Sequence, residues 1–475
     1  MKFIGRKKEL DDLSRLLKKK SASFVVIRGR RRIGKSRLIQ EFSKGKKNWI
    51  FSGLPPEPGV TKKMQLDAFS TQMAQQLLCP KIQASEWDEL FWILGNQVKK
   101  EQLVIVFDEI SWMGSEDPSF LGHIKNLWDL HFSKNPHLIF IVCGSVSTWI
   151  EQNILSSSGF LGRISIDLVL QELSLSECQK YWEEYEDRIS AFEKFKVLSV
   201  TGGVPKYLEE IIPEDSAETN IQKLCFQSQG LLYREYDQIF SDLFSNKAKT
   251  YSAIVDLLAR DSLDLNEICH FLQIEKGGAT SRYLKDLILS GFVAEDCSWN
   301  LKSKKPSNLK HFRLKDNYLR FYSRYIQPNK EKIAQRLFYF KSFSDLAGYE
   351  SIIGLQFENL VLNNLSSICD HLNINMTEIV MAGPFFQKKT QRQKGCQIDL
   401  LIQTKTQILY LCEVKFQTSE IKNSIVHEVQ EKIMRLSKPR SYSVRPVLIH
   451  VNGVHENVQK NGFFSHILDF SQLLK

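Results

Sequence analysis

Two short groups of residues near the start of the chain have the types and spacing that phosphate chemistry requires. Gly29–Ser36 is a glycine-bounded loop ending in Gly-Lys-Ser, and Asp108–Glu109 is a pair of adjacent carboxylates. Glycines let backbone N–H groups curl around phosphate oxygens, a lysine can reach the β- and γ-phosphates, and a serine hydroxyl can bind Mg²⁺. The pattern predicts an ATP site with Mg²⁺ as cofactor.

Each polar residue of this predicted site has its own expected role. We expect Lys35 to pair with phosphate, and Ser36 and Asp108 to hold Mg²⁺. Glu109 would polarise the attacking water as general base. Ser145 would lie beside the γ-phosphate as a sensor of hydrolysis, the alternative being a plain turn serine. The residues expected to contact the nucleotide follow one another along the chain: Gly29, Arg30, Arg31, Arg32, Ile33, Gly34, Lys35, Ser36 and Arg37.

Apolar runs place these residues at the ends of predicted strands. Residues 23–27, 102–107 and 137–143 are nearly continuous apolar segments, which is typical of strands buried in a parallel sheet. Leu38, Ile39 and Phe42 follow the glycine loop at helical spacing. The loop therefore joins a strand to a helix, as this phosphate-binding motif requires.

A second group of chemically capable residues lies near the end of the chain. Residues 397–402 and 408–416 are predicted to form the two strands of a hairpin. Side chains alternate along a strand, so Glu413 and Lys415 share one face, and a short hairpin can bring Asp399 beside them. Glu358, in a predicted helix, is the candidate for a further carboxylate.

These carboxylates and the lysine could cleave a phosphodiester bond with the help of Mg²⁺. The expected metal ligands are Glu358, Asp399 and Glu413, and Lys415 would orient or activate the attacking water. The segment before Asp399 is basic, so a nucleic-acid backbone could approach it. Its basic residues are Lys388, Lys389, Arg392 and Lys394. The alternative is an edge hairpin whose charges face solvent.

Between these two groups, three short predicted helices and a strand pair indicate a winged helix-turn-helix. The helices are expected near 251–258, over 264–272 and over 280–289. The third helix would expose side chains able to meet phosphate or base edges: Thr280, Ser281, Arg282 and Lys285. The alternative is a spacer module without DNA contact. Residues 311–322, dense in aromatics and arginines, are expected to form an amphipathic helix that docks domains together.

The first 230 residues resemble the archaeal-type ATPase family, within the AAA+/STAND group of P-loop NTPases. The resemblance rests on Gly5-Arg6, the loop at 29–36, the motifs around 106–109 and 143–145, Leu161-Gly162-Arg163 and residues 201–208. It implies that Gly5 and Arg6 lie near the nucleotide base, and that Pro205 belongs to a small helical lid. It also implies that Arg163 can touch phosphate, in its own or a neighbouring subunit, so self-association is among the open alternatives.

The C-terminal part resembles a domain of unknown function (DUF234) that is commonly fused to these ATPases. Asp399 followed by Glu413-Val414-Lys415 on a hairpin is similar to the motif of the PD-(D/E)xK nuclease superfamily. The resemblance implies a restriction-endonuclease-like fold, and cleavage remains a separate question because a fold does not guarantee an activity.

Length and composition frame these predictions. A chain of 475 residues is too long for one core, so several domains are expected.

No apolar run approaches the length of a membrane span and the first residues lack a signal peptide, which favours a cytoplasmic protein without a membrane partner. The nine cysteines are scattered singly, against structural zinc or disulfides. The net charge of +10, with 17 Lys/Arg against 4 Asp/Glu in residues 1–50, suits nucleotide or nucleic-acid partners.

We therefore predict a multidomain α/β protein. Its expected parts are a P-loop, AAA+-like parallel sheet (1–170), a helical lid (171–240), a winged helix-turn-helix (241–308) and a nuclease-like α/β domain (309–475). The predicted function is an ATPase coupled to DNA binding and Mg²⁺-dependent phosphodiester cleavage. The alternatives are a nucleotide-dependent switch that does not cut and a DNA-binding regulator.

Overall fold

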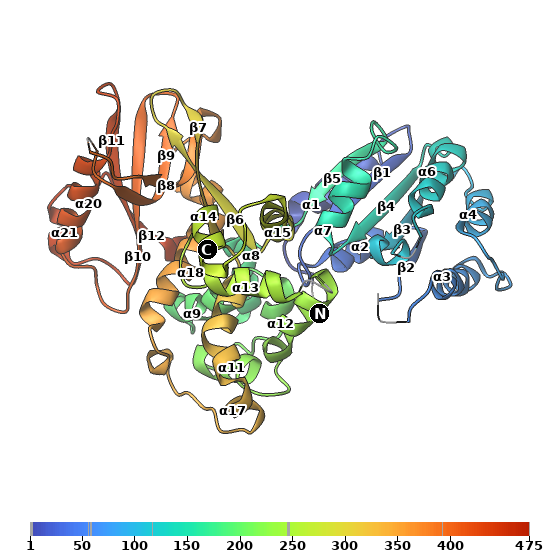
Figure 1. The fold of residues 1–475 in the computed structure, drawn as a ribbon, viewed down its shortest axis with the longest axis horizontal. Helices are drawn as coiled ribbons and strands as arrows, with labels where there is room; N and C mark the ends of the chain where they lie inside the picture. Colours follow the sequence, from blue (N-terminus) through green and yellow to red (C-terminus); the bar gives the residue numbers. More distant parts are fainter. Residues whose placement is uncertain are drawn as a thin grey trace. The chain divides into compact units, whose positions relative to one another are not determined.

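The computed structural model describes residues 3–474 except Pro56, Pro58, Glu116, 245–247 and Arg392. Arg392, one of the basic residues predicted to approach nucleic acid, thus lies outside the described residues. The chain divides into two compact units (Figure 1). Unit 1 comprises the residues up to Gln171 together with Leu289–Gly291, and unit 2 comprises Glu172–Ile288 and the residues from Phe292 onwards.

Unit 1 is built around a five-stranded sheet with the strand order β2-β3-β4-β1-β5 (Figure 1). Every neighbouring pair of strands is parallel. The strands are β1 (Ser23–Arg28), β2 (Asn48–Ser52), β3 (Leu103–Asp108), β4 (Leu138–Gly144) and β5 (Ile164–Val169). The three strands predicted from apolar runs are confirmed as β1, β3 and β4.

Helices cover both faces of this sheet because alternate residues of a strand point to opposite sides. Val25 and Ile27 of β1 pack in one core with α1 and α2, while Phe24 and Val26 pack in another core with α3, α4 and α6. Burial on both faces explains why these strands are continuously apolar. The helices are α1 (Lys7–Leu16), α2 (Lys35–Ser43), α3 (Lys62–Leu77), α4 (Trp87–Asn96), α5 (Ile110–Met113), α6 (Phe120–Leu130) and α7 (Ser147–Ile150).

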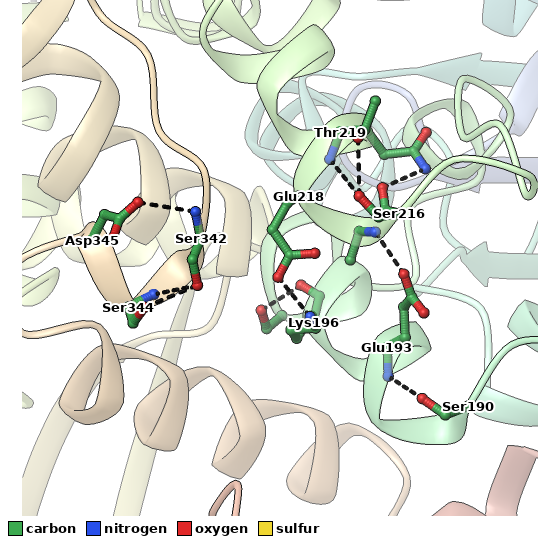
Figure 2. Close-up of polar contacts among 12 residues, drawn as sticks. Ser190, Glu193, Lys196, Ser216, Glu218, Thr219, Ser342, Ser344 and Asp345 are labelled. Carbon is green, nitrogen blue, oxygen red and sulfur yellow. Dashed lines mark hydrogen bonds and ion pairs between the residues drawn. The ribbon is translucent and has the colours of Figure 1, made fainter.

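Unit 2 begins with a group of helices, and serine side chains cap the N-termini of α8, α9 and α11. Ser190 accepts a hydrogen bond from the Glu193 N–H at the start of α9, and Ser216 accepts one from the Thr219 N–H at the start of α11 (Figure 2). Glu193 in turn accepts a hydrogen bond from the Ala217 N–H at 2.9 Å, so the two helix ends hold each other. The helices are α8 (Leu175–Cys178), α9 (Ala191–Thr201), α10 (Pro205–Leu208), α11 (Ala217–Cys225) and α12 (Leu231–Phe244).

Three further helices and an antiparallel hairpin follow, in the order expected for a winged helix. The helices are α13 (Ala248–Leu258), α14 (Leu265–Leu272) and α15 (Gly278–Leu289), and the hairpin strands are β6 (Val293–Asn300) and β7 (Lys305–Leu314). Asp264 caps α14, accepting hydrogen bonds from the N–H groups of Asn266 and Glu267. Phe292 and Leu314, at the hairpin ends, are buried in the same core as Leu284 of α15.

The last part of unit 2 contains a mixed sheet with the strand order β12-β11-β10-β9-β8. Strands β8, β9 and β10 form an antiparallel meander, and β11 then pairs parallel to β10 after the crossover helix α20. The strands are β8 (Ile379–Gln387), β9 (Cys396–Thr404), β10 (Ile408–Phe416), β11 (Ser443–Val451) and β12 (His466–Asp469). The helices of this part are α16 (Asn317–Phe321), α17 (Lys330–Ala334), α18 (Tyr349–Asn363), α19 (Leu365–His371), α20 (Ser424–Arg435) and α21 (Glu456–Lys460).

One continuous core joins these parts of unit 2. Phe195 of α9, Leu258 of α13, Phe357 of α18 and Cys412 of β10 belong to the same cluster of buried residues. The segments predicted as lid, winged helix and C-terminal domain therefore share their apolar interior.

The amphipathic helix predicted over residues 311–322 needs correction. His311–Leu314 are the end of strand β7, and α16 begins only at Asn317, where Asp316 caps it by accepting a hydrogen bond from the Leu319 N–H. The aromatic spacing of this segment fits a helix, but pairing of Phe312 with Glu295 in the hairpin determines the strand. The segment still contacts another part of unit 2, because Tyr318 donates a hydrogen bond to the Leu232 carbonyl of α12.

Two global findings complete the description. Among the residues that the structure describes, no helix combines the length and apolar character needed to cross a bilayer. The nine cysteines are free thiols.

We expect Ser216→Ala to destabilise unit 2 by about 1 kcal/mol, because an alanine cannot accept the hydrogen bond from the Thr219 N–H. Urea denaturation of the full chain followed by circular dichroism would show a lower midpoint. Ser216→Thr keeps the acceptor and should stay close to the original midpoint. Equal midpoints for the alanine and threonine variants would contradict the capping role.

Candidate functional site

The glycine loop of unit 1 takes the shape that a phosphate-binding loop needs. Gly34 has φ of 92° and caps α2, which begins at Lys35. Gly29 has φ of 150°, and a Cβ there would lie 2.7 Å from the Leu170 carbonyl oxygen, so only glycine fits. Lys35 Nζ donates hydrogen bonds to the carbonyl oxygens of Gly29 (3.0 Å) and Arg30 (3.2 Å). The lysine is thus folded back over its own loop, and burial lowers the pKa of its ammonium.

The predicted magnesium pair is brought together. Ser36 Oγ donates a hydrogen bond to Asp108 Oδ2 at 2.9 Å, although 72 positions separate the two residues. Cys143 Sγ contacts the other carboxylate oxygen at 2.7 Å, and burial raises the pKa of this thiol, so it remains a neutral donor. A serine hydroxyl at the start of α2 and a carboxylate at the end of β3 are suitable oxygen ligands for a Mg²⁺ ion that also binds nucleotide phosphates. When bound there, Mg²⁺ would neutralise the charge of the phosphate oxygens.

Glu109 and Ser145 also lie together. Glu109 adopts a left-handed backbone conformation, with φ of 49°, where β3 ends and α5 begins. Its Oε2 accepts hydrogen bonds from both the N–H and the hydroxyl of Ser145, each at 3.0 Å. Ser145 therefore positions the carboxylate predicted to act as general base.

Arg6 packs against the loop from behind. Its guanidinium donates hydrogen bonds to the Ile33 carbonyl at 3.0 Å and to the Gln171 carbonyl at 2.5 Å, and Arg6 is buried. Glu9 pairs with the same guanidinium at 3.2 Å. Arg6 thus supports the loop backbone, and the placement of Gly5 and Arg6 near the nucleotide base stays a prediction. Sequence reasoning missed these loop contacts because carbonyl acceptors leave no pattern in the chain.

The structure corrects one expectation for Arg163. Strand β5 is parallel to β1 with Ile164 opposite Phe24, so Arg163 lies at the amino edge of the sheet, whereas the glycine loop follows the carboxyl end of β1. At about 3.3 Å per residue, the length of β1 separates the two. Arg163 instead forms a two-pronged ion pair with Asp129 of α6, at 2.8 and 3.0 Å. Contact with phosphate within the same chain is excluded, and contact with a neighbouring copy stays a prediction.

Known proteins can now be compared with this geometry. Residues 3–211 match the model of an ATPase domain found predominantly in Archaea. Together with the loop, the Ser36–Asp108 pair and the Glu109–Ser145 pair, this match decides the class of unit 1. Unit 1 has the α/β fold of a P-loop ATPase.

Similar proteins cover more of the chain than this domain. An uncharacterized protein of Methanocaldococcus jannaschii is 24% identical over 442 residues, which is 92% of this chain and 92% of that protein. An uncharacterized ATP-binding protein of the same organism is 42% identical over 45 residues, 10% of this chain and 76% of that one. The Walker-type ATPase of Pyrococcus abyssi aligns at a TM-score of 0.50 with 14% identity, over 68% of this chain and 96% of that one. The last comparison shows a shared fold alone.

Outside the ATPase domain, unit 2 brings the predicted carboxylates of β9 and β10 together. Asp399 Oδ2 accepts a hydrogen bond from the Val414 N–H at 2.9 Å, which places it against β10. Glu413 is 1% exposed, and its Oε1 lies 3.0 Å from Lys415 Nζ. Lys432 of α20 lies 2.5 Å from Glu413 Oε2 and 3.7 Å from Asp399 Oδ1. Two carboxylates and two ammonium groups thus form one partly buried network.

The electrostatics of this network follow from burial. Burial, and next the charge of Glu413, raise the pKa of Asp399 to about 6. Burial, and next the charge of Asp399, raise the pKa of Glu358 on α18 to about 7. The pKa values of Lys415 and Lys432 are raised by the carboxylates around them, although burial opposes this. Both lysines therefore stay charged and neutralise the carboxylates.

In this arrangement lysine ammonium groups, and not a set of metal ligands, surround Glu413. Both oxygens of Glu413 are already paired with ammonium groups. Over the described part of the chain, no three His, Cys, Asp or Glu side chains are grouped so that they could hold a metal. The predicted ligand set of Glu358, Asp399 and Glu413 is therefore corrected, because Lys432 lies between the two strand carboxylates.

Lys432 is the residue of this site that sequence reasoning missed. A signal was present, because Lys432 follows Ile425 and Val429 at helical spacing on the buried stripe of α20. A lysine on an apolar stripe requires a buried partner, and here the partners are the strand carboxylates.

The third helix of the segment predicted as a winged helix exposes most of the predicted residues. Ser281, Arg282 and Lys285 of α15 are exposed. Thr280 is buried, and its hydroxyl donates a hydrogen bond to the Glu275 carbonyl at 3.3 Å, so the expectation that it faces nucleic acid is corrected. At the tip of the β6–β7 hairpin, Lys302, Lys304 and Lys305 are exposed as well.

We expect Glu358→Gln to reduce the pH dependence of stability. The pKa of Glu358 is about 7 in the folded protein against 4.5 for an unperturbed glutamate, so the folded state binds this proton more tightly. Its contribution to stability is complete below about pH 4.5 and is lost as the pH rises through about 7. Glutamine cannot ionise, so the fall in melting temperature between pH 5 and pH 8 should be smaller in the variant. Glu378→Gln, which changes an exposed glutamate, is the control. If the melting temperature of Glu358→Gln falls between pH 5 and pH 8 by as much as that of this control, the burial argument is contradicted.

Proposed function

We propose that this protein is an ATP-hydrolysing switch that binds DNA through unit 2. The observation that carries the proposal is the meeting of the Ser36–Asp108 pair and the Glu109–Ser145 pair at the carboxyl edge of one parallel sheet. The first pair would hold Mg²⁺ and the second would hold the general base, which are the two requirements for cleaving the γ-phosphate bond.

Each residue of the ATPase domain then has a defined task. Lys35 leaves its loop carbonyls to pair with the β- and γ-phosphates, so its present hydrogen bonds keep a buried ammonium satisfied until nucleotide arrives. Glu109 takes a proton from the attacking water. Ser145 holds the Glu109 carboxylate in place, and a change at the γ-phosphate can alter this contact after hydrolysis.

DNA binding is supported by exposed cationic side chains on two elements of unit 2. Helices α13–α15 and the β6–β7 hairpin have the element order of a winged helix, in which the third helix meets the major groove. The exposed Arg282 and Lys285 lie on that helix, and the exposed lysines 302, 304 and 305 lie on the hairpin that would form the wing. Phosphate contacts by such side chains give affinity without reading sequence.

Phosphodiester cleavage is the second candidate function, and one observation favours it. The order α18–β8–β9–β10–α20–β11, with Asp399 on β9 and Glu413 and Lys415 on β10, is the arrangement expected for the PD-(D/E)xK superfamily. The lysine pairs on Glu413 oppose it. We therefore place DNA binding before cleavage.

Two variants of the ATPase domain separate nucleotide binding from hydrolysis. Lys35→Ala should weaken ATP binding about 10- to 100-fold, since hydrogen bonds to a charged group contribute about 1.5–3 kcal/mol. Glu109→Gln should bind ATP normally and lose about 10²- to 10⁴-fold in turnover, because the general base is removed. Calorimetric titration and phosphate release, with and without duplex DNA, measure these effects. Unchanged binding in Lys35→Ala, or unchanged turnover in Glu109→Gln, would refute the assignments.

Cleavage is tested by incubating labelled DNA with the full chain in Mg²⁺ or Mn²⁺. If the β9–β10 carboxylates cut, Glu413→Gln should abolish product while ATP turnover is retained. Glu428→Gln, at an exposed partner of Lys415 3.4 Å away, is the matched control and should still cut. The absence of product from the unmodified protein, with DNA still bound, would leave the non-cleaving switch as the function.

A further inference from the structure

A cleft of about 600 Å³ in unit 2 has features that neither ATP hydrolysis nor duplex binding uses. Its walls come from α14, β7, the end of β8, the start of β9 and α20. The rings of His311 and Phe386 both line it, and they are stacked with centroids 4.3 Å apart and planes 14° from parallel. Resting on the proposed nucleic-acid binding, we infer that this cleft binds an unpaired nucleotide of a nucleic-acid strand, with its base on the His311–Phe386 pair.

Hydrogen bonds hold the backbone that carries the Phe386 ring. Phe386 donates its backbone N–H to Ser298 Oγ and accepts the Ser298 hydroxyl at its carbonyl, both at 2.7 Å. Ser298 is buried, and the β6–β7 register shifts between Cys297 and Trp299, which frees Ser298 to bond to β8. A fixed ring loses little conformational entropy when a base stacks on it, so the platform is ready for binding.

Cationic side chains at the same cleft suit a phosphate group. Lys388 and Arg435 line it and are exposed, and each is paired with a carboxylate: Lys388 with Asp264 at 3.7 Å and Arg435 with Glu431. Exposed ion pairs of this kind contribute about 0–1 kcal/mol, so a phosphate can replace the carboxylate. Gln387 fixes this rim, because its amide donates hydrogen bonds to the carbonyls of Lys394 and Arg435, each at 2.7 Å.

The carboxylates of the opposite wall are already engaged. Asp264 and Glu267 accept hydrogen bonds from backbone N–H groups at the start of α14, where the helix dipole favours negative charge. Asp399 lies at the inner end with Lys432, which also lines the cleft. These carboxylates therefore repel a phosphate in the cleft only weakly.

The chemistry of the cleft favours an unpaired strand over a duplex. In a duplex both faces of every base are covered by its neighbours, so a stacked ring pair can meet only a base that has left the stack. A volume of about 600 Å³ is also the size of a small-ligand site and cannot admit a double helix. Binding of duplex DNA by α15 and binding of an unpaired strand in this cleft would thus be two separate interactions, both made by unit 2.

The test is binding of the full chain to fluorescein-labelled 20-mers: single-stranded DNA, single-stranded RNA of the same sequence, and blunt duplex. Phe386→Leu and His311→Leu keep a side chain of moderate size and remove the aromatic face. Each should weaken single-strand binding about 5- to 150-fold, the range of one base–aromatic stack, and leave duplex binding within twofold. Phe271→Leu, at an exposed ring of α14 outside the cleft, should leave all three unchanged.

The outcomes separate this inference from the function on which it rests. Single-strand affinity that stays within twofold in both cleft variants, or an equal loss for duplex, overturns the inference. Unmodified protein that binds duplex but not single strands also overturns it, while the DNA-binding switch survives. Binding of neither form overturns both. If the cleft variants lose affinity equally for single-stranded DNA and RNA, the base is the recognised group. If they lose affinity for only one of the two, that strand is the ligand.

Discussion

The parallel register of β3, β4 and β1 is the constraint on which the ATPase site depends. Arg28 lies opposite Gly144 and Phe107 opposite Val142, so the residues that follow these strands emerge at one edge. Three groups meet at this edge: the glycine loop, the Asp108–Glu109 pair and Ser145. No local sequence pattern connects them. A shift of one residue in β3 would turn Asp108 to the other face of the sheet and separate it from Ser36.

Supporting contacts then hold the edge in shape. The left-handed conformation of Glu109 costs free energy, and the two hydrogen bonds from Ser145 offset that cost. Arg6 stabilises the loop at the Ile33 carbonyl, and Cys143 contacts the oxygen of Asp108 that Ser36 leaves free. Removing Ser145 would take both of these hydrogen bonds from the Glu109 carboxylate, so the contacts of the site depend on one another.

In unit 2 the governing interaction is charge neutralisation of a buried carboxylate. Glu413 is almost inaccessible to solvent, and an isolated buried charge would be very costly, so Lys415 and Lys432 must lie close to it. Each oxygen of Glu413 has a lysine partner. The two ammonium groups therefore supply the positive charge that balances the carboxylates of this hairpin.

The sequence by itself determined the local elements and the P-loop. The apolar runs at β1, β3 and β4, the hairpin of β9 and β10, and the glycine loop between β1 and α2 are decided by residue type and spacing, because burial on two faces and phosphate contact each demand particular side chains.

Tertiary structure decided which residues these elements contact. Arg163 was assigned to phosphate from its motif, but the direction of β5 places it at the opposite edge beside Asp129. Residues 311–314 became a strand because β6 pairs with them, and Lys432 entered the carboxylate pair because α20 packs on that face. Strand direction, cross-strand pairing and helix packing join residues far apart in the chain, and such contacts leave no trace in the local pattern of the sequence.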